Sequence, residues 1–108
     1  MTSESAQVQQ LRERYISSMP EKATMITEHI HVLLDQDSPN QETYDLIRED
    51  AHKLAGSLGM YGYNDIASVA RNIMSIIDQG DAEQLQLELL NLRNLLRQLI
   101  KSLSLIHI

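Results

Sequence analysis

The sequence predicts an all-α fold, an antiparallel up-and-down four-helix bundle with an additional N-terminal helix. Apolar residues recur at three- and four-residue spacing along most of the chain, which is the period of one face of a helix. The connections between these stretches are short, and short connections favour antiparallel neighbours. The 108 residues are 43% hydrophobic, enough to build one core, so we expect a single domain over residues 1–108.

The first two helices are predicted on either side of Pro20. The first covers residues 5–18 and carries an apolar stripe made of Val8, Leu11 and Tyr15. Residues 18–21 have the pattern of a capping box with proline in the first turn, which predicts that a second helix begins there and runs to residue 35. Its buried face is formed by Ala23, Ile26, Ile30, Leu33 and Leu34. The N-terminal helix is thus expected to cover one end or side of the bundle.

The third and fourth helices are predicted over residues 41–58 and 65–78. A turn at residues 37–40 precedes the third helix, and Gly80 ends the fourth. The third helix buries a stripe made of Tyr44, Ile47, Ala51, Leu54 and Leu58. The fourth buries Ile66, Ala70, Ile73 and Ile77.

The last helix begins after Asp81, a favourable N-cap residue. Its leucines recur at alternating four- and three-residue steps, at Leu85, Leu89, Leu92, Leu96, Leu99 and Leu103. This seam fits either the core-facing stripe of a bundle or a parallel dimeric coiled coil. A coiled coil would need longer heptad continuity and separate cover for the other helices, so the bundle is favoured and we expect a monomer.

Charge and composition exclude several classes of protein. A formal net charge of -6 disfavours a nucleic-acid phosphate backbone as the ligand. The chain has no cysteine, so it forms no disulfide and no thiolate metal site. No apolar run approaches the roughly 20 residues of a membrane span, and the start lacks the pattern of a signal peptide. We therefore expect no membrane partner and a cytoplasmic location.

His52 is set among conspicuously small residues on the third helix. Ala55 and Gly56 lie one turn later and Gly59 follows, so bulky groups that would wall off the imidazole are missing on that side. Glycine inside a helix costs about 1 kcal/mol relative to alanine, so Gly56 implies a purpose such as the close approach of another surface.

Residues 51–62 resemble the signature of histidine-containing phosphotransfer (HPt) domains, commonly written His-x-Leu-Lys-Gly with a further glycine near the helix end. The matching residues are His52, Leu54, Gly56 and Gly62. The resemblance implies that His52 accepts a phosphoryl group and relays it between receiver-domain aspartates, as a carrier without turnover of its own. It implies response-regulator receiver domains and a hybrid sensor histidine kinase as partners. It also implies that this chain needs no cofactor, since the receiver brings the Mg²⁺. Ala55, Gly56 and Gly59 are expected to leave room for the receiver to approach His52.

Two residues depart from the family pattern. The basic residue of the signature usually follows the histidine by three positions, where this chain has Ala55, and the lysine here is Lys53. Its long stem could still bring the ammonium near a phosphoryl oxygen, so Lys53 is the expected phosphate neighbour. Many members also carry Glu or Gln near the position of Met74, which methionine cannot replace as a hydrogen-bonding partner of the histidine.

A rival interpretation is a non-catalytic helical adaptor, either a degenerate phosphotransfer bundle or a coiled-coil dimer. His29 and His31 lie about 200° apart around their helix, so they cannot share a metal ion, and no metal site is expected. His107 is likewise expected to have no role. No glycine-rich nucleotide loop is present, so the chain is not expected to be a kinase.

Overall fold

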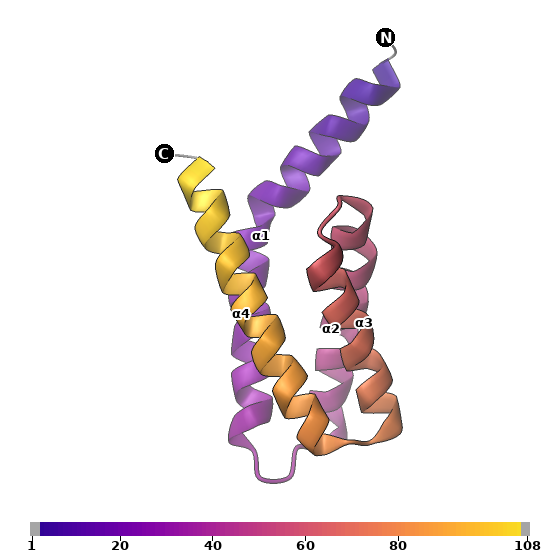
Figure 1. The fold of residues 1–108 in the computed structure, drawn as a ribbon, viewed down its shortest axis with the longest axis vertical. Coiled ribbons are helices and arrows are strands. Elements are labelled where there is room, and N and C mark those ends of the chain that lie inside the picture. Colours follow the sequence, from indigo (N-terminus) through magenta and orange to yellow (C-terminus); the bar gives the residue numbers. More distant parts are fainter. Residues whose placement is uncertain (1–2, 107–108) are drawn as a thin grey trace.

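The computed structural model describes residues 3–106, which form four α-helices and no strand (Figure 1). The helices are α1 (Ser3–Asp35), α2 (Gln41–Met60), α3 (Asn64–Gln79) and α4 (Ala82–Ile106). Each helix packs against the next one in the chain, and α4 closes the bundle by packing against α1. The predicted all-α bundle is therefore confirmed, but its helices are the four just named, without an additional N-terminal helix.

Helix α1 runs through Pro20 without a break, so the prediction of two helices meeting at residues 18–21 is wrong. In a capping box the Ser18 hydroxyl would accept a backbone N–H, whereas here it donates to the carbonyl of Tyr15 at 2.7 Å, inside the helix. Met19 is fully buried, which holds the residues around the proline in helical register against the core. Pro20 cannot donate to the carbonyl of Ile16, and Figure 1 shows α1 bending in its middle.

The first part of α1 projects from the bundle as an arm (Figure 1). Every residue from 5 to 14 is exposed, including Val8 at 57% and Leu11 at 56%. The apolar stripe predicted there therefore does not cover an end or side of the bundle, and packing begins only at Tyr15, which is half-buried. The arm makes the molecule elongated, with extents of 53 × 28 × 20 Å.

The core lies along the bundle axis and is built from the predicted faces of all four helices. All six leucines of the α4 seam are buried inside the bundle. The boundary residues also behave as predicted: the Asp81 side chain accepts the backbone N–H of Gln84 at 3.1 Å, and Gly80 ends α3 in the left-handed conformation with φ 78°. Three predicted core residues differ, because Leu34, Tyr44 and Ile77 are only half-buried. On α3, Ile76 is buried in place of Ile77.

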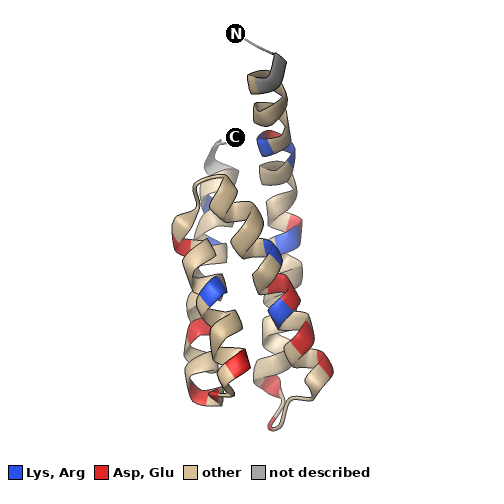
Figure 2. Ribbon diagram, turned by 90° about the vertical axis from the view of Figure 1, so that its right-hand side faces the viewer, with Lys and Arg blue, Asp and Glu red and all other residues tan. Residues whose placement is uncertain are grey.

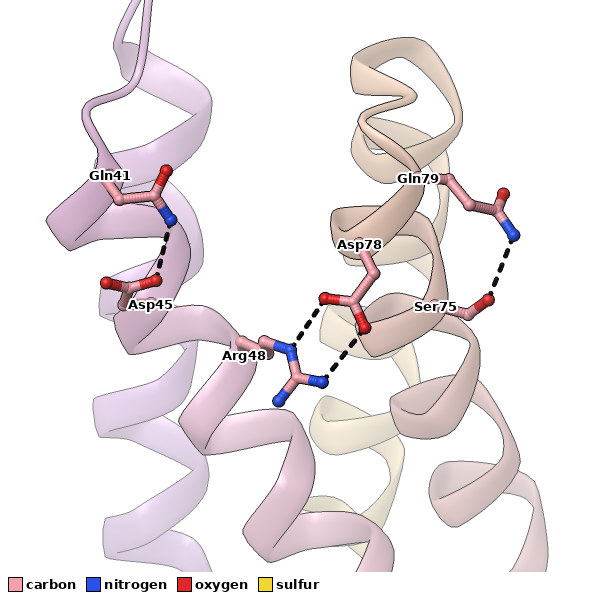
Figure 3. A network of polar contacts seen from close by, with 6 residues as sticks. All are labelled: Gln41, Asp45, Arg48, Ser75, Asp78 and Gln79. Atoms are coloured by element: carbon pink, nitrogen blue, oxygen red, sulfur yellow. Dashed lines mark hydrogen bonds and ion pairs between the residues drawn. The ribbon is translucent and has the colours of Figure 1, made fainter.

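Helices α2 and α3 pack closely because small residues line their contact. Ala51, Ala55 and Gly59 recur every four residues on α2, and a Cβ on Gly59 would lie 3.5 Å from the Cβ of Ala67. Arg48 on α2 forms hydrogen bonds with Asp78 on α3 (Figure 3). Arg48 precedes Gly59 by eleven residues, and Asp78 follows Ala67 by eleven residues. These two contacts define one antiparallel register for the whole interface.

Candidate functional site

His52 lies on α2, off the face that enters the core. Asn40 begins this helix by accepting the backbone N–H of Thr43 at 2.9 Å. The buried stripe of α2 follows at Ile47, Ala51, Leu54 and Leu58, so the register of the helix turns His52 outward. The side chain is exposed. An exposed imidazole on a rigid helix can be reached by the active site of another protein.

The other described histidines are engaged in contacts between helices. His29 Nδ1 lies 2.7 Å from Asp50 Oδ2, which ties α1 to α2. The Nη1 of Arg93 donates to His31 Nε2 at 3.1 Å, which ties α4 to α1. Within residues 3–106, His52 is the histidine without a hydrogen bond or ion pair. His107 lies outside the described residues.

The three small residues near His52 have different surroundings. A Cβ on Gly56 would meet no atom within 4 Å, so this side of α2 is open. Ala55 is half-buried against the core, and Gly59 faces Ala67 of α3. The structure thus leaves the predicted clearance role open for Gly56 and gives Ala55 and Gly59 contacts within the bundle.

Lys53 lies on the α1 side of α2. Lys53 and His52 lie about 100° apart around the helix axis. Lys53 lines a groove between α1 and α2. Gly59, which is on nearly the same side of α2 as His52, faces α3. The Lys53 ammonium lies 3.0 Å from Glu49 Oε1, one turn earlier on the same helix. Its charge is therefore already partnered by a carboxylate in the unphosphorylated protein.

Arg48, one turn before His52, is also paired. Its Nε and Nη2 donate to the two carboxylate oxygens of Asp78 at 3.0 and 3.1 Å, and Figure 3 shows this fork bridging α2 and α3. The hydrogen bonds from Arg48, and then its charge, hold the pKa of Asp78 below its usual value, while Asp78 raises the pKa of Arg48. Hydrogen bonds Gln41 to Asp45 and Gln79 to Ser75 lie on either side of this pair.

Arg71 is the cation near this site that the sequence analysis did not single out. It is exposed on α3, and its Nη1 lies 4.0 Å from the position of a Cβ on Gly59. It forms no ion pair within the described part of the chain. Only the register of α3 against α2 brings it beside the histidine helix, so no local sequence pattern could have identified it.

The groove between α1 and α2 has an apolar floor with charged edges. It is lined by Tyr15, Lys22, Met25, Ile26, Asp50, Lys53, Leu54 and Ser57. At one end Tyr15 packs on Tyr61, with ring centroids 5.3 Å apart, and the Lys22 ammonium lies 4.3 Å from the centre of the Tyr15 ring. Burial raises the pKa of Tyr15. Met25 is 52% exposed, so the groove offers an apolar surface beside Lys53.

Charged residues are spread over the bundle, with acidic residues gathered toward the end that holds the α1–α2 and α3–α4 turns (Figure 2). Within residues 3–106, His, Asp and Glu side chains form no cluster of three that could hold a metal ion. Among residues 3–106, none of the helices has the length and hydropathy of a membrane-spanning segment.

The sequence matches a known protein family. The family model described as the Hpt domain matches residues 10–104. No curated protein and no solved structure matches the chain. Hpt domains are helical bundles that act in histidine phosphotransfer and interact with receiver domains and kinases of phosphorelays. Because the match covers nearly the whole bundle, the chain belongs to the Hpt domain family.

Proposed function

We propose that this chain is a phosphoryl carrier of the cytoplasm that receives a phosphoryl group on His52 from one receiver-domain aspartate and passes it to another. The observation that carries the proposal is the state of His52. It is exposed and has no hydrogen-bond or ion-pair partner within residues 3–106, while His29 and His31 are held by Asp50 and Arg93. A hybrid sensor histidine kinase and response regulators are the partners that fit such a relay. The chain would have no turnover of its own.

The proposed transfer needs only a neutral imidazole placed in line with the scissile bond. The unprotonated ring nitrogen of His52 attacks phosphorus, an N–P bond forms, and the P–O bond to the receiver aspartate breaks, so that the aspartate leaves as a carboxylate. The proton on the other ring nitrogen stays in place. The receiver brings the Mg²⁺ that neutralises charge on the phosphoryl oxygens, so this chain has no need of a cofactor.

The groove between α1 and α2 is the surface we expect the receiver to cover. Its exposed apolar residue, Met25, lies on α1 beside Leu54 and Lys53, next to His52 in the chain. Apolar area at the centre of a contact with charged residues at its rim is the usual anatomy of a protein interface. A receiver seated there would place its aspartate over the open side of α2 at Gly56.

The proposal is tested by labelling the chain from receivers that already carry phosphoaspartate. His52→Gln should abolish the label, while His29→Gln and His31→Gln should retain it, because those rings are engaged between helices. The label should be lost in acid and survive base, as expected for a phosphoramidate. Circular dichroism of each variant checks that the bundle is folded. Label that persists in His52→Gln would show that another residue accepts the phosphoryl group.

A parallel incubation with ATP and Mg²⁺ separates a carrier from a kinase. We expect no label from ATP alone, because the sequence holds no glycine-rich phosphate loop. Rapid labelling of the chain from ATP alone would refute the proposal that it is a phosphoryl carrier. If no receiver from a complete panel labels the folded wild-type chain, the helical adaptor becomes the better interpretation.

A further inference from the structure

Phosphorylation would place about two negative charges on the exposed face of α2, and the nearby cations differ in their freedom to respond. Lys53 lies on the α1 side and is paired with Glu49, while Arg48 is held by both oxygens of Asp78. Arg71 has no carboxylate partner within residues 3–106. Of these three cations, Arg71 alone can turn to a new anion without breaking an ion pair.

The register of α3 against α2 places Arg71 at the level of the site. Arg48 faces Asp78, and Gly59 faces Ala67, so the two helices advance by the same eleven residues between these contacts. In that register Ala55 falls level with Arg71, and His52 falls level with Met74. Arg71 therefore projects from α3 at the position that follows His52 by three residues on α2.

The length of the Arg71 side chain matches the distance it has to cover. Its guanidinium already reaches the level of Gly59, which is four residues, or about 6 Å, beyond Ala55 along the axis. His52 lies three residues, or about 4.5 Å, in the opposite direction. Its exposed, flexible stem lets Arg71 turn from one level to the other.

We propose that Arg71, on α3, contacts the phosphoryl group on His52 and balances its charge, in the role that the sequence pattern suggested for Lys53. This inference rests on the proposed function. A guanidinium suits the task because its N–H groups match two phosphoryl oxygens at once. The half-buried Ala55 fits the same arrangement, since a small residue there lets α3 approach and present Arg71.

The test compares Arg71→Ala, Arg71→Lys and the matched control Arg97→Ala in transfer from a phosphorylated receiver. Arg97 is an exposed arginine on α4, a helix that packs on α1 and α3 and not on α2 within the described residues. We expect Arg71→Ala to slow transfer about tenfold to a hundredfold, the range for a lost charged hydrogen bond. Arg71→Lys should recover most of the rate, and Arg97→Ala should stay within about twofold.

Two further measurements exclude a merely structural role or a contact with the receiver. Phosphoramidate, a small phosphodonor without a protein surface, should label Arg71→Ala more slowly than wild type. In a ³¹P NMR titration of the phosphorylated chains, the pKa of the phosphoryl group should be higher in Arg71→Ala, because a nearby cation stabilises the dianion. Slower transfer from the receiver with an unchanged phosphoryl pKa and normal phosphoramidate labelling would overturn the inference and make Arg71 a receiver contact.

Wild-type labelling separates this inference from the proposed function. If wild type is labelled and His52→Gln is not, His52 is the acceptor, and a normal rate in folded Arg71→Ala then overturns the role of Arg71 alone. If wild type takes no label from any receiver or from phosphoramidate, the proposed function and the inference fail together.

Discussion

Gly56 lies one turn after His52 on the open side of α2, where a Cβ would meet no atom within 4 Å. Gly56→Ala and Gly56→Leu should each stabilise the bundle by about 1 kcal/mol, because both residues lose less entropy in a helix than glycine does. Only the leucine should slow transfer from a receiver, since its bulk stands in the path of approach. Chemical denaturation and single-turnover labelling measure the two effects. Equal transfer rates in the two variants would show that Gly56 provides no clearance.

The sequence alone singles out the proposed acceptor, His52, but not the contacts that surround it. His52 and Gly56 could be identified because their pattern is local to one helix. The pairing of Lys53 with Glu49 depends on how two long side chains arrange themselves on the surface, which spacing does not determine. Arg71 could not be found at all, because its approach depends on the register between two helices.

Among the helices, the α2–α3 pair is tied at one end by Arg48 and Asp78. The pKa of Asp78 is lowered in the folded protein, so the ion pair stabilises the fold above the usual carboxyl pKa, and this contribution is lost as the pH falls through the lowered pKa. Arg48→Gln should raise the pKa of Asp78 toward its usual value, as seen by NMR titration of its carboxyl group. The control Arg97→Gln should leave it unchanged. An unaltered Asp78 titration in Arg48→Gln would mean that the pair does not form in solution.

The boundaries of α2, α3 and α4 were predicted to within a few residues, whereas α1 was divided wrongly. The predicted turn at residues 37–40 does precede α2, and the predicted N-cap Asp81 does precede α4. The serine and proline near residue 20 have the same local pattern, but the burial of Met19 and Ala23 keeps the chain helical there. Proline in a helix interior costs about 3 kcal/mol, and burying two side chains in a core is an effect of comparable size. A local sequence pattern does not show whether the gain from burying these side chains exceeds the cost of the proline.

In the whole molecule, the leucine seam of α4 decides between a bundle and a coiled-coil dimer. All six seam leucines are buried by other helices of the same chain, and Leu96 is 0% exposed. Leu87 lies on the same helix but is 68% exposed, which makes it a matched control. Because the seam is already covered within the chain, we expect it not to pair with a second copy.

Leu96→Ala should therefore lower the free energy of unfolding by about 2 to 5 kcal/mol, because it leaves a cavity in the core. Leu87→Ala should change it by no more than about 0.5 kcal/mol, as expected for an exposed side chain. Both variants and wild type should sediment as monomers, with thermal midpoints that do not depend on protein concentration. A dimeric coiled coil predicts the opposite. The thermal midpoint of wild type would then rise with protein concentration, and Leu96→Ala would shift the dimer toward monomer. That result would contradict the bundle core and favour the adaptor interpretation.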